Sequence, residues 1–358
     1  MFGGSVNIPE YDEPLQMAGG ENNAYTTSDL TNYYIQLPAE NIETAFWLES
    51  DRMLSLAFSE KSLDVQRKVV CEEFKEHYIN KPYGDIWHKM RDLAYTVHPY
   101  KWMTIGKELA HIEDAKLEDV KNFFFKYYRP TNAILVVAGK VTTSQVKALA
   151  EKWFGDIPAG ERIQRNIPQE PVQKEAHKLE VKANVPLDAL YKCYHMPGRM
   201  DKDYYAIDLI SDILGGGASS RLHQVLVKEK KLFSNIDCYH FGTLDAGLFT
   251  IEGKLVKGVK MKDAEKAIQE ELDKVQQEII PERELQKVKN RVESMLAFED
   301  MGLLNRANNL AFYELMGDAA LMNAEFSNYE AVTAEEMHKQ AAMLFDEKNS
   351  NTLYYYAG

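Results

Sequence analysis

Several features are scarce or missing in this 358-residue sequence, and each absence excludes a class of protein. The three cysteines, Cys71, Cys193 and Cys238, are odd in number and widely spaced, so we expect no disulfide framework and a reducing, cytoplasmic environment. No apolar run reaches membrane-spanning length, and neither a basic nor an apolar signal-type segment follows Met1. Lysine and arginine (42) are outnumbered by aspartate and glutamate (55), and the net charge of −13 argues against nucleic acid or anionic lipid as a partner.

Common catalytic signatures are also missing. The sequence has no Gly-x-Ser-x-Gly elbow, no Cys-x-x-Cys pair and no His-x-x-x-His pair. Gly215–Ser220 superficially resembles a dinucleotide-binding loop, but it follows a helical pattern rather than a strand, and Ser220 replaces the third glycine. Gly242–Gly247 has the spacing of a phosphate-binding loop, but Leu248 and Phe249 replace the required lysine and hydroxyl residue. Serine hydrolysis and nucleotide binding therefore have no local support.

What the sequence does contain is a duplication. The last eight residues, Asn351–Gly358, repeat the pattern of Asn132–Gly139, and an amphipathic helical pattern precedes both strand-like segments. In the first copy, that helical pattern consists of Leu117, Val120, Phe123, Phe124 and Tyr127. The second copy opens with the strand-like segment His177–Val185, whose counterpart would lie about 40 residues before Met1. We therefore expect the first copy to lack its opening.

The order of the expected elements gives the fold class. Strands at 19–27 and 32–37 are followed by helices, and strands at 177–185 and 189–196 are followed by helices at 202–214 and 219–230, two strands and further helices. Strands joined by turns, with helices in blocks, indicate antiparallel sheets covered by helices on one face, an α+β fold present twice. Prolines without any periodic pattern mark 156–176 as a linker, so the expected domains are 1–155 and 177–358.

The richest cluster of polar groups is Val69–His77. On a helix, Glu73 and His77 would lie four residues apart on one face, where both could touch a metal. A Glu–His pair at this spacing is more often a surface ion pair, and catalytic zinc takes three protein ligands. From the residues alone, the sequence predicts two similar α+β domains without a defined chemistry.

Five segments, taken in order, resemble the insulinase/pitrilysin family of inverted-motif zinc peptidases, in its short branch that is similar to processing peptidases. The segments are GGENNAYT (19–26), VVCEE (69–73), AYTVHPY (94–100), YRPTNAILVVAG (128–139) and LGGGASSRL (214–222). Each is weak alone, but five in this order on a visible duplication are specific and cover nearly the whole chain. His98, in the third segment, is interpreted as a packing or capping residue.

The resemblance implies a zinc site on the first domain. The family's H-x-x-E-H helix supplies two histidine ligands and a glutamate base, and a glutamate roughly seventy-five residues later supplies the third ligand, which by this register is Glu73. The family's glutamate seven residues before that ligand is Gln66 here. Residues 1–3 match those just after the second histidine, so the resemblance indicates a family member that is truncated at its N-terminus just past the motif. With Glu73 alone, the chain is predicted neither to bind zinc nor to hydrolyse peptides, and no catalytic residue is assigned to it.

The resemblance also implies substrate contacts. In the family, the N-A-Y-T edge strand takes the peptide as an added strand, which assigns Asn23, Ala24 and Tyr25 to substrate binding; the alternative is that Asn23 only shapes the turn. Active single-chain members carry an Arg and a Tyr, seven residues apart, that bind the substrate from the second domain. Their positions here are Val227 and Ser234, so a related subunit in a hetero- or homodimer is expected to supply this pair.

Two specific functions remain open, beside the more general one of a peptide-binding module that its partner regulates. The first is a subunit of a zinc metalloendopeptidase that binds and cleaves extended or unfolded peptides in a chamber built from four such domains. The alternative is a non-catalytic peptide-binding or scaffold subunit, similar to the partner subunits of processing peptidases or to core proteins of respiratory complexes. In either case, loss of the first strand is expected to uncover a sheet edge and to favour lower stability or self-association.

Overall fold

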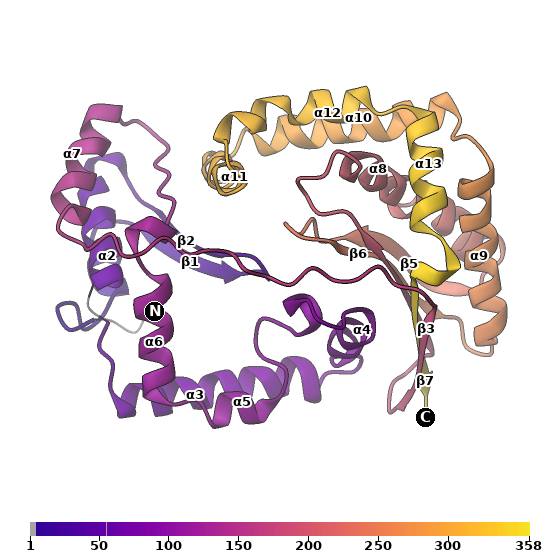
Figure 1. Ribbon diagram of the computed structural model, residues 1–358, viewed down its shortest axis with the longest axis horizontal. Helices are drawn as coiled ribbons and strands as arrows, with labels where there is room; N and C mark the ends of the chain where they lie inside the picture. Colours follow the sequence, from indigo (N-terminus) through magenta and orange to yellow (C-terminus); the bar gives the residue numbers. More distant parts are fainter. Residues whose placement is uncertain (1–4, 55) are drawn as a thin grey trace. The chain divides into compact units, whose positions relative to one another are not determined.

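The structure, a computed structural model, describes residues 5–54 and 56–358. The chain forms two compact units that do not follow chain order (Figure 1). Unit 1 is drawn from Met1–Glu76, Thr104–Asn166 and Glu299–Met322, and unit 2 from His77–Met103, Ile167–Phe298 and Asn323–Gly358. This division groups residues by contact, whereas the boundaries expected from the sequence, 1–155 and 177–358, divide the chain into repeated halves. Those boundaries stay a prediction.

Unit 2 is built on a five-stranded sheet with the order β3-β7-β4-β6-β5. Its strands are β3 (His177–Ala183), β4 (Ala189–Met196), β5 (Phe233–His240), β6 (Gly247–Leu255) and β7 (Ser350–Ala357). Although β3 and β4 are consecutive in the chain, the last strand, β7, lies between them, parallel to β3 and antiparallel to β4. The other pairs are antiparallel. The last strand, β7, is therefore an interior strand with a neighbour on each side, and its residue Leu353 is completely buried.

A layer of helices covers one face of this sheet. It consists of α8 (Tyr204–Gly215), α9 (Met261–Gln277), α10 (Glu282–Glu299), α12 (Glu325–Ala331) and α13 (Ala334–Leu344). Leu190, Tyr194 and Phe249 of the strands are buried against these helices in one continuous apolar core. Burial of apolar area of this kind is the main source of stability in a folded domain. The fold is α+β, as the sequence predicts.

The opposite face of the sheet is covered by α4 (Ile86–Ala94), which the sequence places in the first copy. The sequence predicts that Ile86, Met90, Leu93 and Ala94 face inward. The structure buries Ile86, Met90 and Ala94 against Tyr191 and its neighbours in the sheet, whereas Leu93 is only partly buried. Within unit 2 both faces of the sheet are therefore covered, where the sequence indicated helices on one face. The difference arises because α4 is grouped with a sheet that begins about 80 residues later in the chain.

Glu170 anchors the irregular segment that precedes β3. Its carboxylate accepts hydrogen bonds from the backbone N–H groups of Thr96 (2.7 Å), Val97 (3.0 Å) and His98 (2.8 Å), and from the Thr96 hydroxyl. Partial burial raises the pKa of this carboxyl group, but the four donors more than offset that effect, so the pKa of Glu170 lies below its ordinary value. The ionised carboxylate therefore holds this segment to the loop after α4.

We expect Glu170→Gln to lower the free energy of unfolding by about 1–2 kcal/mol at pH 7, because the amide turns one acceptor into a donor in a partly solvated site. The folded-state pKa is depressed, so the contribution is full above the unfolded pKa of about 4.3 and is lost as pH falls through the lower folded value. Urea unfolding at pH 7 and at pH 4 measures both effects. Glu175→Gln, an exposed control in the same segment, should change stability by less than about 0.5 kcal/mol.

Unit 1 has a smaller antiparallel sheet, formed by β1 (Glu21–Thr26) and β2 (Thr31–Gln36). Its helices are α1 (Asp12–Met17), α2 (Ile42–Leu54), α3 (Glu60–Phe74), α5 (Leu109–Glu113), α6 (Leu117–Tyr127), α7 (Thr143–Phe154) and α11 (Leu303–Leu315). In the two units together, short 3-10 turns occur at η1 (Ala39–Asn41), η3 (Pro99–Lys101), η4 (Pro130–Asn132), η6 (Ala319–Ala324) and η7 (Glu347–Asn349). Two segments are π-helical, η2 (Lys75–Ile79) and η5 (His223–Glu229). A cluster of Ile8, Tyr11, Leu15 and Leu48 packs under the sheet.

One predicted strand is absent. The sequence predicts that 132–139 matches β7, but in the structure residues 133–138 belong to neither a helix nor a strand. A strand needs neighbours to satisfy its backbone groups, and β7 has them in β3 and β4. Within the described part of unit 1 the strands are β1 and β2, which pair with each other. The 132–139 strand prediction is therefore wrong for this structure, and Leu135 stays 53% exposed.

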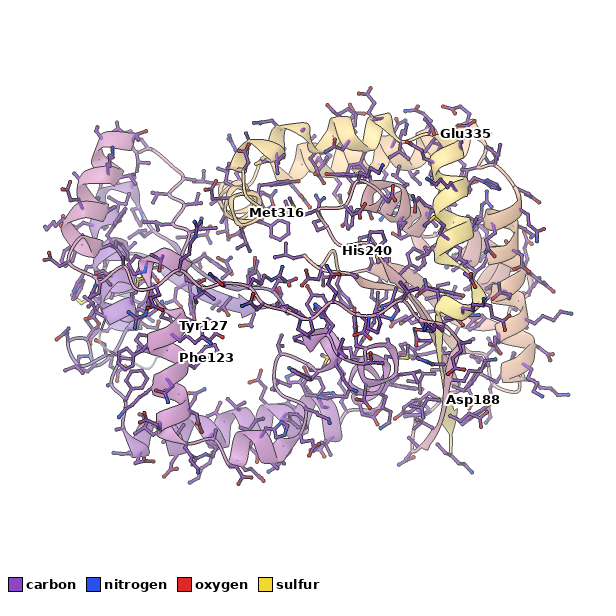
Figure 2. The ribbon with its side chains drawn as sticks, viewed as in Figure 1. Phe123, Tyr127, Asp188, His240, Met316 and Glu335 are labelled. Atoms are coloured by element: carbon purple, nitrogen blue, oxygen red, sulfur yellow. The ribbon has the colours of Figure 1, made fainter. Side chains whose placement is uncertain are left out.

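The helix before that segment shows a similar difference. The sequence predicts an apolar face of Leu117, Val120, Phe123, Phe124 and Tyr127 on α6, but of these only Phe124 is buried. Phe123 is 57% exposed and lies against Tyr127 one turn further along the helix, with ring centroids 4.7 Å apart (Figure 2). The period of the helix is predicted correctly, but the cover for most of its apolar face is not found among the described residues.

Candidate substrate strand and zinc position

The β1–β2 hairpin directs alternate backbone groups of β1 to its outer edge. At the turn, the Thr27 N–H donates to the Leu30 carbonyl oxygen over 2.9 Å, so these two residues form a hydrogen-bonded pair. Because bonded and non-bonded pairs alternate in an antiparallel ladder, Tyr25 and Asn23 are in bonded pairs with β2. Ala24 is in a non-bonded pair, and its N–H and C=O therefore face away from β2.

The side chain of Asn23 is hydrogen-bonded to the outward N–H of Ala24. The Asn23 Oδ1 atom accepts this N–H over 2.8 Å, so the side chain satisfies the edge of its own strand. Asn23 and Tyr25 are both exposed, Tyr25 by 46%. The three residues that the sequence assigns to substrate binding thus form a solvated edge. The backbone N–H of Ala24 is bonded there only to the side chain of the preceding residue, which another acceptor could replace. A substrate role for them stays a prediction.

Aromatic and charged groups support this hairpin from α2. The Arg52 guanidinium lies 4.4 Å from the ring centroid of Tyr33 on β2 and 4.4 Å from that of Tyr11, and it pairs with Glu49 at 2.9 Å. The Tyr33 hydroxyl lies 2.7 Å from the Tyr128 hydroxyl. Burial, followed by this hydrogen bond, raises the pKa of Tyr33 well above its ordinary value, so the phenol stays protonated. The hairpin is therefore held from one side by a partly buried cluster of aromatic and charged side chains.

Glu73 lies at the last turn of α3, where Cys71 and Phe74 face inward and Glu73 is exposed. His77 follows in the π-helical segment η2 and is also exposed, as is Gln66. No group of three or more His, Cys, Asp or Glu side chains that could hold a metal is found among residues 5–54 and 56–358. Since catalytic zinc takes three protein ligands, these residues do not fit a zinc site. Glu73 keeps its role as third ligand only as a prediction.

The positions of the expected Arg/Tyr pair have other roles in unit 2. Val227 is partly buried against the core, and the Ser234 hydroxyl donates to the Lys254 carbonyl oxygen over 3.0 Å. The nearby Arg221 makes a two-pronged ion pair with Glu284, with the closest atoms 2.6 Å apart. A partner subunit that supplies the pair therefore stays a prediction.

A polar cluster on the helix-covered face of the unit 2 sheet was not predicted from the sequence. Lys192 of β4 is only 6% exposed and is in phase with the buried residues Leu190 and Tyr194. The signal was present, because a lysine two residues from each of two apolar residues in a strand shares their inward face. Thr352 of β7, which lies directly opposite Lys192 in the sheet, is 1% exposed, and nothing in the sequence around it indicates this role.

Residues 1–92 match the family of insulinase-type peptidases (peptidase family M16), and residues 114–292 match the peptidase M16 inactive domain. The zinc protease PqqE of Helicobacter pylori is 32% identical over 80% of this chain, a match that spans 65% of that relative, less than two thirds of its length. The uncharacterized zinc protease YmxG of Bacillus subtilis is 27% identical over 94% of this chain and 81% of that protein.

The crystal structure of a protease from Helicobacter pylori, 28% identical in sequence, superimposes with a TM-score of 0.93 over 99% of this chain and 87% of that one. The chain belongs to the insulinase (M16) peptidase family. This confirms the family predicted from the five sequence segments and the α+β fold predicted from the order of strands and helices. Among the described residues, no helix is long and apolar enough to cross a membrane.

Proposed function

We propose that this chain is a peptide-binding subunit of an insulinase-family zinc metalloendopeptidase, and that an extended peptide adds as a strand to the outer edge of β1. The outward N–H and C=O of Ala24 carry this proposal, because strand addition takes its affinity from main-chain hydrogen bonds at a free edge. The side chain of Asn23 would release the Ala24 N–H, which would then donate to the bound peptide. The side-chain amide of Asn23 would in turn form a hydrogen bond with the next backbone group of that peptide. Tyr25, exposed beside them, would contact a peptide side chain.

Hydrolysis needs groups that the described residues do not supply. A zinc-bound water with a lowered pKa is the nucleophile that metallopeptidases use, and a carboxylate takes its proton. Glu73 is one carboxylate without two further ligands nearby, so we derive no catalytic step from this chain. We propose that peptide cleavage requires a segment or subunit that brings two ligands and a base.

The second candidate is a non-catalytic peptide-binding or scaffold subunit. What supports it is that no three side chains able to hold zinc come together among the residues that the structure describes. Both candidates use the edge of β1, and both leave room for a related subunit that supplies the Arg/Tyr pair. Zinc content and peptidase activity separate the two candidates. The reducing, cytoplasmic compartment stays a prediction.

Strand addition predicts a specific effect of proline at the edge. Because the Ala24 N–H faces away from β2, Ala24→Pro should keep the β1–β2 ladder while it removes one donor to the peptide and places a ring against it. We expect the dissociation constant of an extended fluorescein-labelled peptide to rise by about tenfold or more. Fluorescence anisotropy measures it.

Thr31→Pro is the matched control for this experiment. Thr31 pairs with Thr26 in a non-bonded pair, so its N–H faces the outer edge of β2 instead. Peptide affinity should stay within about twofold of the parent in that variant. Equal weakening in both variants, or none in Ala24→Pro, would rule out addition at β1.

A further inference from the structure

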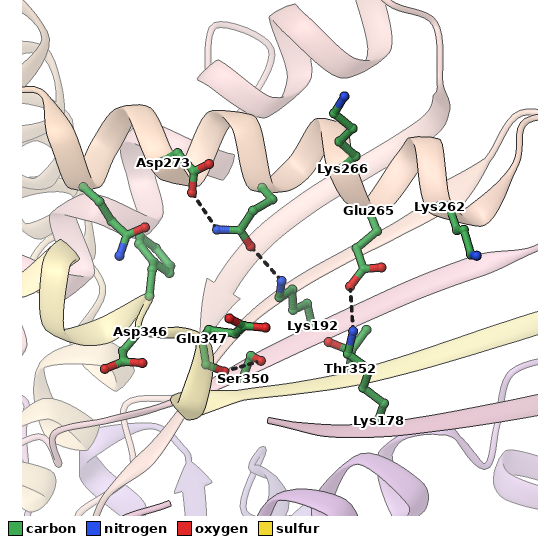
Figure 3. A pocket seen from close by; sticks show the side chains of 13 residues that line it. Lys178, Lys192, Lys262, Glu265, Lys266, Asp273, Asp346, Glu347, Ser350 and Thr352 are labelled. Carbon is green, nitrogen blue, oxygen red and sulfur yellow. Dashed lines mark hydrogen bonds and ion pairs between the residues drawn. The ribbon is translucent and has the colours of Figure 1, made fainter. Parts of the chain in front are cut away.

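A cavity of about 550 Å³ in unit 2 lies between α9 and the sheet (Figure 3). On its floor, Lys178 of β3 is opposite Thr352 of β7, and Thr352 is opposite Lys192 of β4. Residues directly opposite each other in neighbouring strands point to the same face, so these three side chains form a row. The row faces Glu265 and Gln269 of α9.

Lys192 is a buried cation whose partner is neutral. Its Nζ atom donates to Gln269 Oε1 over 2.9 Å, and the Gln269 amide donates in turn to Asp273 Oδ1 over 2.8 Å. Within the part of the chain that the structure describes, Lys192 forms no ion pair. Burial lowers the pKa of this ammonium group. The negative charge of Glu265 raises that pKa, but it offsets the effect of burial only in part. The ammonium also lies 5.7 Å from the ring centroid of Tyr194. Gln269 Oε1 accepts one of its three N–H donors, so at least one donor is left for another group.

Thr352 adds a second unused donor. Its Oγ1 atom is buried and has no hydrogen-bond partner among the described residues, although Thr352 lines the cavity and is only 1% exposed. A buried hydroxyl without a hydrogen-bond partner destabilises the folded state, so such groups normally bind water or a ligand. The Tyr194 hydroxyl, on the same face of β4, is likewise without a partner among those residues.

The other charged groups of the cavity are already engaged or lie at its rim. Glu265 accepts from the Tyr354 hydroxyl over 2.8 Å and lies 3.9 Å from Lys178. Lysines and acids both line the mouth of the cavity: Lys262, Lys266, Asp346 and Glu347. On the floor, Thr352 Oγ1 has no hydrogen-bond partner among the described residues, and Lys192 binds a neutral amide, although the Glu265 carboxylate lines the same cavity. The rim carries both signs of charge.

We propose that this cavity binds an oxyanion, the carboxylate or phosphate group of a small polar ligand, through Lys192 Nζ and Thr352 Oγ1. The anion accepts from the ammonium and the hydroxyl and so satisfies both buried groups at once. The volume falls within the range of small-molecule sites and exceeds that of the anion itself, so the remainder of the ligand occupies the mixed-charge rim. This site is independent of the peptide edge at β1 and of zinc.

The test is a titration of the 358-residue chain with inorganic phosphate and, separately, with acetate, at constant ionic strength and pH 7. Phosphorus-31 and carbon-13 NMR follow the two probes. Saturable binding of one equivalent, with a dissociation constant of about 0.1–5 mM, is expected for at least one probe. Phosphate alone would assign a phosphoryl ligand, and acetate alone a carboxylate. No saturation by either probe up to about 20 mM would overturn the proposal.

Substitutions locate the site. Lys192→Met and Thr352→Val keep the size of each side chain and should weaken binding by about tenfold or more, whereas Lys257→Met, which removes one exposed charge elsewhere, should leave it unchanged. Saturable binding that survives both cavity substitutions would place the anion elsewhere and overturn the proposal. If Lys192→Met does not fold, the isosteric Thr352→Val, together with the Lys192 ammonium NMR signal of the unmodified protein on titration, decides the same question.

Discussion

Zinc is expected to bind this chain at less than about one tenth of an equivalent, and hydrolysis of extended peptides is expected to be undetectable. Glu73 offers one carboxylate at the exposed end of α3, and no group of three suitable side chains is found in the described residues. A single exposed carboxylate competes poorly with water for zinc, and the activated water depends on the metal. Atomic absorption of the dialysed protein and a fluorogenic peptide assay measure both expectations.

Added ligands should change this result in a way that depends on Glu73. If a helix with an H-x-x-E-H motif is fused to the N-terminus, zinc should approach one equivalent, and Glu73→Gln should weaken it by about 100-fold or more. Glu72→Gln is the matched control, because Glu72 is also exposed on α3 and only pairs with Lys75 at 2.8 Å. Stoichiometric zinc in the unfused chain, lost in Glu73→Gln, would contradict the predicted shortage of ligands.

Local signals in the sequence predicted most elements correctly. The sequence from Thr142 to Phe154 has a Thr/Ser start, apolar residues on one face and Gly155 as a stop, a pattern that predicts a helix. This helix is α7, and the Thr142 hydroxyl accepts from the Gln145 N–H over 3.2 Å as its cap. His98 is confirmed as a buried capping residue, since its Nδ1 accepts from the Tyr100 N–H over 3.1 Å. These features depend on neighbours a few residues away, and such neighbours are visible in sequence.

Features that depend on distant neighbours were predicted less well. The 132–139 segment has the apolar pattern of β7, yet a strand forms only where another strand can bond it. The helix predicted over 219–230 is largely the π-helical segment η5, which leads to Lys231 with a φ of 53°. The register between β1 and β2 also decides which backbone N–H and C=O groups point to the outer edge of β1, and the identities of Asn23 and Ala24 do not show this. The family resemblance therefore located the candidate substrate strand, and the structure added which of its backbone groups face outward.

The second large effect is expected at a buried ion pair in unit 2. Glu325→Leu should lower the free energy of unfolding by about 3–5 kcal/mol, because it leaves the Arg199 guanidinium buried without its carboxylate. The two side chains are 7% and 9% exposed and are directly hydrogen-bonded, and the Tyr205 hydroxyl donates to Glu325 over 3.2 Å. Burial opposes the charge on Arg199, but Glu325 more than offsets this, so the pKa of Arg199 lies above its ordinary value.

Urea unfolding of a double-mutant cycle tests this expectation. Arg199→Met combined with Glu325→Leu removes both charges, so its stability should return to within about 1–2 kcal/mol of the parent. Glu330→Leu, an exposed position on the same helix α12, should change it by less than about 0.5 kcal/mol. A small loss in Glu325→Leu alone would mean that water reaches Arg199. The guanidinium would then be held mainly by the rings of Tyr204 and Tyr205, whose centroids lie 4.6 and 5.4 Å away.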